Sequence, residues 1–522
     1  RIKKQKIMNP FNSINVFAPK RNKFDMSHEK KLTLDMGYLV PTFCQQVLPG
    51  DSWKVQTELM LRFLPMLAPI MHRIKVYTHY YFVPNRLVWD EWEPFITGGT
   101  DGDLTPEMPH WFTSDSAYFG KGTLSDYLGI ETPPQGAIWD FKHQVLPFRA
   151  YQQIYNDYYR DPNDDSQLID YYKGSGAINT GPGGQTNQEN FHYTLRKRSW
   201  AKDYFHGALP WAQRGDQAIM PMSGTIQSQL VAKDSDGNPI GSEDITTGAL
   251  GDVQAGTNTT TFESVDNDAI DGSFTINDLR ASVKLQEWLE KMARGGARYV
   301  EQILTHFGEV SPDQRLQRAE FLGGGSQNVV ISEVLSTTQS TAENQPLGEF
   351  AGHGISVGTQ NRFQKKRFKE HGYVIGIMSI MPTPQLMNGS ERHFFYQDKL
   401  DYAWPTFANL GEQSVYKGEV KMPYTNSFGE ERHRQTFGYQ PRYAEYKWAK
   451  STIHGEFRDT LKYWHMARDY TNENPNIYGF FEYDGDKRIF AVQEADENNI
   501  IANVYHKASA LRALPYYGTP KL

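Results

Sequence analysis

The sequence feature that most constrains the fold is a strict alternation of apolar and polar side chains in two neighbouring segments. In Trp53–Phe63, every second residue is apolar or Thr, and the positions between them include Lys54, Glu58 and Arg62. Ile74–Phe82 has the same period. Because successive side chains of a strand point to opposite faces, both segments are predicted to be strands with one buried face.

Three later segments also have strand character. Tyr373–Met381 is apolar almost throughout, which predicts a strand buried on both faces. Arg488–Val492 and Ile500–Tyr505 are predicted to form a hairpin late in the chain. Strands near both ends, with long irregular segments between them, favour a mainly β protein: an antiparallel sandwich with large inserted loops and a few helices.

Helical periodicity is confined to a few places. From Leu285 to Phe307, apolar residues recur at i, i+3 and i+4, with Asp278 as the expected N-cap and Gly308 as the expected stop. Gly295-Gly296 interrupts the pattern and is predicted to kink or split the helix. Two shorter helices are predicted at Phe148–Arg160 and Phe457–Tyr470.

The charge of the chain is distributed unevenly. The formal net charge is −7, yet residues 216–278 hold eleven acidic residues and one basic residue, Lys233, which gives −10 for that segment alone. The segment contains only two aromatic residues, so it cannot build a sizeable core. We therefore expect 216–278 to be a surface insertion in a sandwich domain made of 51–215 and 279–522.

The first 50 residues lack a helical or strand period. Asn9-Pro10-Phe11-Asn12 and Ala18-Pro19 are turn-forming sequences with isolated apolar residues. Residues 1–50 are therefore predicted to form an extended N-terminal arm. No stretch approaches the roughly 20 apolar residues that a membrane-spanning helix needs, so no membrane span is expected.

Catalytic and metal-binding patterns are weak. A single cysteine, Cys44, excludes an intrachain disulfide and a cysteine zinc site, and the histidines are scattered, so no metal or cofactor is expected. Gly354-Ile355-Ser356-Val357-Gly358 matches a nucleophile elbow, but no helical pattern follows it. We expect no enzymatic activity. A cytoplasmic hydrolase using Ser356 and a glycan-binding or glycan-cleaving β-sandwich protein remain the alternatives.

Clusters of basic and aromatic residues suggest contact with nucleic acid. Cations attract phosphates and aromatic faces stack on unpaired bases, although a single cluster is more often a solvated strand face. Lys365-Lys366-Arg367-Phe368-Lys369 is one such cluster. The candidate DNA-contacting cations are Lys3, Lys4, Lys6, Arg196, Lys197, Arg198, Arg442, Lys447, Lys450, Lys507 and Arg512. The candidate stacking residues are Tyr443, Trp448, Tyr516 and Tyr517.

Several segments, taken in their order, resemble the major capsid protein of the Microviridae, and the gokushovirus-like branch in particular. They are Asn9–Asn12, Leu32–Pro41, Val47–Asp51, Tyr80–Leu87, Leu146–Tyr151, Tyr204–Trp211 and Gly295–Tyr299. The likeness fades in 216–278, where members of this branch carry a long insertion that forms a protrusion at the capsid threefold axes.

The resemblance implies an eight-stranded antiparallel jelly roll. It implies self-assembly into a T=1 icosahedral shell around circular single-stranded DNA, with no catalytic role. The implied partners are other copies of the chain, the genome, a small basic DNA-packaging protein, a scaffolding protein, a pilot protein, and a host receptor or glycan. The implied location is the virion, and the host cytoplasm during assembly.

Overall fold

The computed structural model describes most of the chain. The described residues are 20–111, 119–132, 142–163, 168–169, 171–178, 193–215, 230–233, 245–247, 253–255, 261–264, 276–295, 298–310, 312–335, 350–422, 432–470, 477–483, 485–494 and 496–517. The chain divides into two compact units. One unit spans Gln213–Arg294, and the other contains the rest of the chain.

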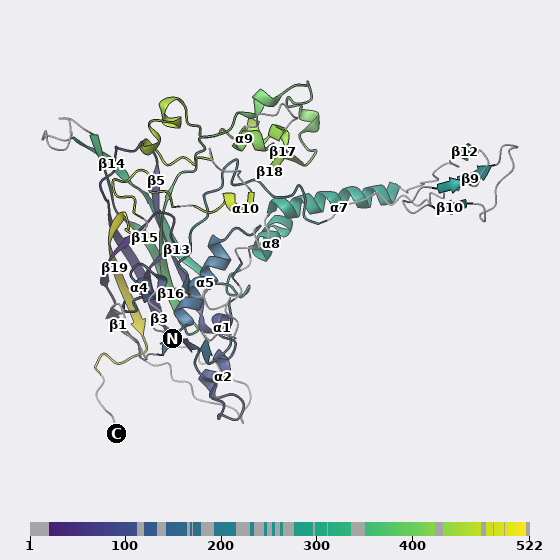
Figure 1. Ribbon diagram of the computed structural model, residues 1–522. Helices are drawn as coiled ribbons and strands as arrows, with labels where there is room; N and C mark the ends of the chain where they lie inside the picture. Colours follow the sequence, from purple (N-terminus) through teal and green to yellow (C-terminus); the bar gives the residue numbers. More distant parts are fainter. Residues whose placement is uncertain are drawn as a thin grey trace. The chain divides into compact units, whose positions relative to one another are not determined.

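The larger unit is built on two antiparallel sheets (Figure 1). The first sheet has six strands in the order β1-β19-β4-β15-β14, and β2 also pairs with β19. Its strands are β1 (Asn22–Asp25), β2 (His28–Leu34), β4 (Ser52–Phe63), β14 (Val330–Leu335), β15 (Phe350–Arg367) and β19 (Ile500–Arg512).

The second sheet has four strands in the order β13-β5-β16-β3. They are β3 (Val40–Val47), β5 (Ile74–Pro84), β13 (Glu320–Asn328) and β16 (Gly372–Pro382). In both sheets, strands from the two ends of the chain alternate, and consecutive strands β2 to β5 alternate between the sheets. The prediction of a mainly β antiparallel sandwich is confirmed.

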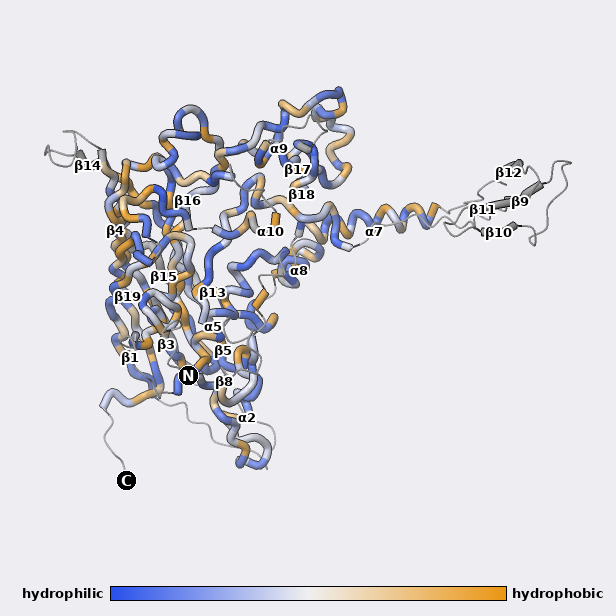
Figure 2. The backbone as a smooth tube through the Cα atoms, viewed as in Figure 1, coloured by the Kyte–Doolittle hydropathy of each residue, from blue (hydrophilic) through white to orange (hydrophobic). Residues whose placement is uncertain are grey.

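The core between the sheets follows from the alternation in the sequence. Trp53, Val55, Leu61 and Phe63 of β4 are buried, as is Tyr80 of β5. The predicted strands at Trp53–Phe63 and Ile74–Phe82 are therefore confirmed, with the predicted faces inside. Figure 2 shows apolar and polar residues mixed along these strands. Each buried side chain of this size contributes about 1.5–3 kcal/mol.

A layer of helices covers the outer face of the four-stranded sheet. Helix α5 (Leu146–Ile154) continues as a π-helix, η1 (Tyr155–Tyr159), which confirms the predicted helix near Phe148–Arg160. Phe148 and Tyr151 share a core cluster with outward-facing residues of β5 and β16. Because β16 is covered on both faces, all of its residues are buried, as the sequence predicted.

Smaller elements complete this unit. The helices are α1 (Asn85–Val88), α2 (Trp92–Thr97), α4 (Leu124–Leu128), α8 (Tyr299–Phe307), α9 (Lys417–Val420) and α10 (Ile477–Phe480). Short strands are β6 (His110–Trp111), β7 (His143–Gln144), β8 (Ala177–Ile178), β17 (Glu412–Tyr416) and β18 (Thr436–Pro441). The short 3-10 helices are Arg392–Phe395, Pro405–Phe407, Arg432–Arg434, Ala444–Tyr446, Gly455–Arg458 and Lys462–Trp464.

The described residues of the smaller unit form one long helix, which ends at the boundary with the larger unit, and four short strands. The elements are α7 (Ile276–Gly295), β9 (Leu230–Lys233), β10 (Ile245–Thr247), β11 (Val253–Ala255) and β12 (Thr261–Ser264). The predicted split of the helix is confirmed, since α7 ends at Gly295. Gly308 follows α8 in the left-handed conformation (φ 70°), as a C-cap glycine does. Asp278 lies in the first turn of α7 rather than at its cap.

The expectation of an arm without strands was wrong for part of its length. Residues 1–19 lie outside the described residues, but β1, β2 and β3 fall within 22–47. Strand β2 pairs with β19 from Ile500 to His506. Its sequence is dominated by Lys, Glu and Thr, because one of its faces is exposed, and this composition hid the strand.

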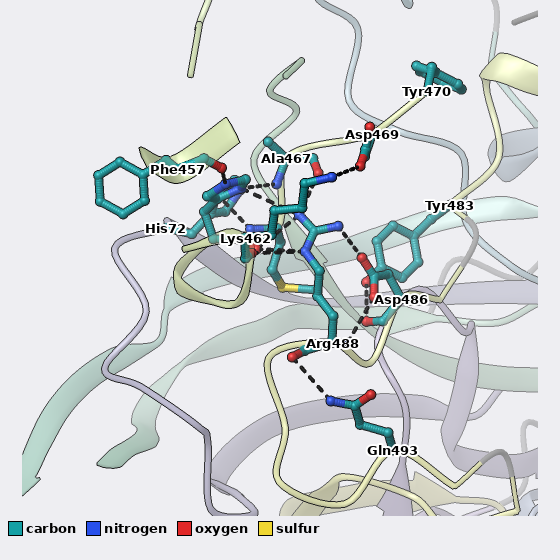
Figure 3. A network of polar contacts seen from close by, with 12 residues as sticks. His72, Phe457, Lys462, Ala467, Asp469, Tyr470, Tyr483, Asp486, Arg488 and Gln493 are labelled. Atoms are coloured by element: carbon teal, nitrogen blue, oxygen red, sulfur yellow. Dashed lines mark hydrogen bonds and ion pairs between the residues drawn. The ribbon is translucent and has the colours of Figure 1, made fainter. Parts of the chain in front are cut away.

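Two further predictions were wrong. Arg488–Val492 is not a strand, and β19 pairs with β1, β2 and β4 instead of forming a hairpin with it. Phe457–Tyr470 contains only short 3-10 turns. Figure 3 shows the reason: the Arg488 guanidinium donates to the backbone carbonyls of Lys462 (3.0 Å) and Ala467 (2.6 Å), and these contacts replace helical hydrogen bonds.

The same network ties this segment to the start of β5. His72 accepts a hydrogen bond from the Met466 amide (3.4 Å), and its other ring nitrogen donates to the Thr383 carbonyl (2.8 Å). Lys462 forms an ion pair with Asp469 at 2.7 Å. A side-chain network therefore fixes a loop that its local periodicity would have made helical.

Candidate nucleic-acid interface

The outer face of the six-stranded sheet is open, in contrast to the covered face of the other sheet. Alternate residues of its strands are exposed, and we call this surface the open sheet face. Its exposed cations are Lys23, Lys31, Lys54, Arg62, Arg362, Arg367 and Lys507, and its exposed acids are Asp25, Glu29 and Glu58. Seven cations against three acids give +4, whereas the whole chain carries −7.

Strand register gathers most of these cations at one end of the sheet. Gln56 of β4 lies opposite Lys507 on one side and Arg362 on the other. Lys54 lies one row further along. Adjacent strands are about 4.8 Å apart and alternate residues about 6.7 Å, so these cations are spaced closely enough to follow one DNA backbone.

The opposite end of the open sheet face carries exposed apolar side chains beside Lys31 and Arg62. Val357 of β15 lies opposite Met60 of β4, and Asn503 of β19 lies on the other side of Met60. Val357 is 70% exposed and Ile501 is 48% exposed. The open sheet face therefore combines an end rich in cations with an end where apolar and cationic side chains are mixed.

The acids on this face are engaged by neighbouring groups. Glu29 accepts a hydrogen bond from the Asn503 side chain (2.6 Å) and lies 3.8 Å from the Lys31 ammonium. Hydrogen bonds from Ser27, helped by Lys23 and Lys507, lower the pKa of Asp25. Two of the three acids thus form local contacts on the face.

The candidates near the C-terminus lie in different environments. Lys507 is exposed on the open sheet face. Arg512 is paired with the buried Asp51 carboxylate (2.8 Å) and packs over the Trp53 ring. Tyr516 stacks on the Phe24 ring, with centroids 5.9 Å apart.

Tyr517 is 80% exposed beside Tyr516. Lys507, Tyr516 and Tyr517 therefore present surface to a ligand, whereas the guanidinium of Arg512 has a structural role.

The Arg196–Arg198 cluster lies on the other side of the sandwich. Arg196 donates to Gln152 (3.0 Å), and burial lowers the pKa of its guanidinium. Lys197 lies over the Tyr38 ring at 5.7 Å. Arg198 donates to Ser379 (2.7 Å). These cations contact the four-stranded sheet and its cover, and the structure does not bring them together with Lys507.

The Arg442–Lys450 cluster is divided between core and surface. Lys450 is buried and pairs with Glu419 at 2.9 Å. Tyr443 is buried as well, with φ of 60°. Trp448 is 55% exposed, and the Lys447 ammonium donates to the Arg442 carbonyl (2.8 Å).

Arg442 itself lies over the Tyr443 ring at 4.9 Å. Lys3, Lys4 and Lys6, the remaining candidates, lie outside the described residues. The DNA-binding assignment of the whole set stays a prediction.

Several cations of the open sheet face do not belong to basic clusters in the sequence, and their exposure follows from strand alternation instead. Lys54 and Arg62 lie eight positions apart on the polar face of a predicted strand, so the signal was strand alternation rather than adjacency. Lys23 and Lys31 lie on strands that were not predicted. Arg367 belongs to the basic cluster Lys365–Lys369 and lies on β15.

The nucleophile-elbow pattern lies inside a strand. β15 runs from Phe350 to Arg367 through Ser356, so no helix follows the serine. Its buried hydroxyl donates to the Asn328 carbonyl at 3.0 Å. Among the described residues, no group of three His, Cys, Asp or Glu side chains is arranged to hold a metal ion. No helix in that part of the chain is long and apolar enough to cross a membrane.

The comparison with protein families tests the resemblance to a capsid protein. The model of the capsid protein (F protein) family matches residues 13–522. The chain belongs to this family. This family consists of structural capsid proteins.

Curated relatives match over nearly the whole length. The chain is 32% identical to capsid protein VP1 of Chlamydia phage 1, over 98% of both chains. It is 32% identical to VP1 of Bdellovibrio phage phiMH2K, over 96% of this chain and 95% of the relative. VP1 of Spiroplasma virus 4 is 28% identical over similar shares. The resemblance to the gokushovirus-like branch of the Microviridae is confirmed, and the protein is a major capsid protein of the virion.

Proposed function

We propose that the chain assembles into a T=1 icosahedral shell around circular single-stranded DNA, with the open sheet face turned toward the genome. The observation that carries this proposal is the charge of that face. Its exposed residues have a net charge of +4, although the whole chain has a net charge of −7, and strand register brings the cations close together. A surface of this kind binds phosphates without reading base sequence.

Exposed aromatic residues support extensive contacts between subunits. Phe394, Tyr402, Trp404 and Tyr446 are each about half exposed or more. Aromatic residues are enriched in the cores of protein interfaces. We assign this surface to contacts within the shell, where a scaffolding protein, a small basic packaging protein and a pilot protein are the further expected partners during assembly in the host cytoplasm.

We propose a separate role for the insertion at 216–278, which corresponds approximately to the unit Gln213–Arg294. Among the α7 side chains that the structure describes, only Ala293 is buried, while Ile276, Leu279 and Val283 are exposed on one stripe. Isolated helices are marginal in water, so this stripe needs a partner. Threefold-related copies would supply it, and the resulting protrusion would carry attachment to a host receptor or glycan.

Binding of single-stranded DNA tests the genome-facing assignment. A triple variant, Lys54→Ala, Arg362→Ala and Lys507→Ala, should lower the slope of log K against log salt by about 2, because each lost phosphate contact removes about 0.7. The measurement is fluorescence anisotropy with a labelled oligothymidylate at several salt concentrations.

The matched control removes three exposed lysines elsewhere on the chain: Lys291→Ala, Lys399→Ala and Lys417→Ala. This control should retain the parent salt slope. Equal slopes for both triple variants would show that the open sheet face does not contact DNA, even if shells form normally.

A further inference from the structure

A cavity of about 610 Å³ lies on the side of the sandwich opposite the open sheet face. His79 and Tyr81, outward-facing residues of β5, line it, and Tyr158 and Tyr159 of the π-helix form another wall. π-helical turns are rare and occur frequently at functional sites. All lining residues belong to the larger unit, so the pocket is complete within one compact part of a single chain.

Four basic and three acidic residues line this pocket, which gives it a formal charge of +1. Two of the acids lie near arginines: Glu301 is 3.4 Å from Arg298, and Asp313 is 3.4 Å from Arg318. Asp161 accepts from the Asn163 amide at 2.8 Å.

Two lining cations are not neutralised in this way. Lys202 is exposed, and Arg198 is held by Ser379 (2.7 Å) and by the Tyr77 ring (4.0 Å from centroid to guanidinium). Within the described residues, neither forms an ion pair with a carboxylate. Both cations are therefore available to an anionic ligand.

The pocket also offers a flat aromatic surface. Phe321 of β13 is 46% exposed, and its ring lies 5.5 Å from Tyr81 and 5.8 Å from His79. Burial lowers the pKa of His79 to about 4, so this ring is neutral near pH 7 and adds no charge beside Phe321. A planar ring could stack on Phe321 while its anionic group meets the two cations.

We propose that this pocket binds a nucleoside monophosphate, with the base on Phe321 and the phosphate at Arg198 and Lys202. The volume suits a ligand of this size, since small-molecule pockets are typically about 300–1,000 Å³. The inference goes beyond shell formation and does not depend on which sheet face meets the genome. The nucleotide could come from solution or from a DNA strand, and the chemistry recognised is the same.

Isothermal titration calorimetry of the full-length subunit with thymidine monophosphate tests the proposal. Thymidine and inorganic phosphate should each bind at least tenfold more weakly, because each lacks one half of the recognised chemistry. Lys202→Ala should weaken nucleotide binding about tenfold, as expected for the loss of a charged hydrogen bond. Lys399→Ala, an exposed lysine that lines neither this pocket nor the open sheet face, is the control and should bind as the parent does.

A decathymidylate without a terminal phosphate distinguishes the two sources. If Lys202→Ala weakens its binding as much as it weakens monophosphate binding, the nucleotide belongs to a strand, and if only the monophosphate responds, it comes from solution. No heat of binding at millimolar thymidine monophosphate would overturn the proposal. Equal affinities for inorganic phosphate and thymidine monophosphate would show that the base does not stack on Phe321. Unchanged affinity of Lys202→Ala for thymidine monophosphate would show that Lys202 does not bind the phosphate.

Discussion

His506 is a histidine without exposed surface between the two sheets, and the fold requires its neutral form. Its Nε2 lies 3.1 Å from the Thr42 carbonyl, which can only accept, so Nε2 carries the proton. Its Nδ1, 2.8 Å from the Thr57 hydroxyl, then accepts. Burial, with a smaller contribution from His28, lowers the pKa of His506 to about 3, against an opposing contribution from the Thr42 hydrogen bond.

The direction of the pH effect follows from these two states. In the unfolded chain His506 titrates near 6.5, so between pH 6.5 and about 3 the unfolded state binds more protons than the folded state. The stability contributed by neutral His506 is therefore complete above pH 6.5 and is lost as the pH falls toward 3. At pH 4.5, two pH units below the pKa of the unfolded chain, the free energy of unfolding has fallen by about 3 kcal/mol, because each pH unit contributes about 1.4 kcal/mol.

Urea unfolding of the parent and of His506→Gln, at pH 7.5 and 4.5, measures this contribution. Glutamine can accept from Thr57 and donate to Thr42 without titrating. Between the two pH values the parent should lose about 3 kcal/mol more than the variant, because carboxylates contribute equally to both. His454→Gln, at an exposed site, should lose as much as the parent. Parallel losses in the parent and His506→Gln would refute the reasoning, as would an NMR titration of His506 near pH 6.5.

Three other substitutions test separate features. Glu419→Gln should cost about 3 kcal/mol in urea unfolding, because the Glu419 side chain is fully buried and pairs with Arg392 and Lys450, which would keep only longer ion pairs with Glu445 (3.4 Å) and Glu391 (3.8 Å). Gly376→Ala should lower thermal stability by about 1–3 kcal/mol, since a Cβ there would lie 2.7 Å from the Tyr80 ring. Leu279→Glu with Val283→Glu should leave the circular dichroism of the subunit unchanged and prevent shell formation, as measured by sedimentation; normal shells would exclude an assembly role for α7.

The parts of the fold that sequence could predict are those in which local pattern and final environment agree. Trp53–Phe63 and Tyr373–Met381 show their burial directly in their periodicity. Strand β2 could not be predicted in this way, because one of its faces is exposed and its charged and polar residues give no apolar period. Phe457–Tyr470 has a helical pattern that Arg488 overrides through contacts with backbone carbonyls about twenty residues away.

The candidate site was harder to predict than the fold. Whether a cation is free depends on partners that are distant in sequence: Arg512 meets Asp51 across 461 residues, and Lys450 meets Glu419 across 31. Neighbouring charges in the sequence therefore identified clusters without showing which of their members reach solvent. Lys507 was a candidate from the sequence and also reaches solvent, because it lies on β19, whose alternate residues are exposed.

The difference between the two sheets explains how an acidic chain can present a surface suited to DNA. Strand β16 of the four-stranded sheet is buried on both faces, so its side chains are almost all apolar or aromatic. The six-stranded sheet is uncovered on one face, and there alternate strand positions can carry charge without a desolvation cost. The excess acid is concentrated in 216–278, away from these strands in the sequence. Selection on each alternate strand position can thus tune the charge of the open sheet face while the core positions, and hence the fold, stay unchanged.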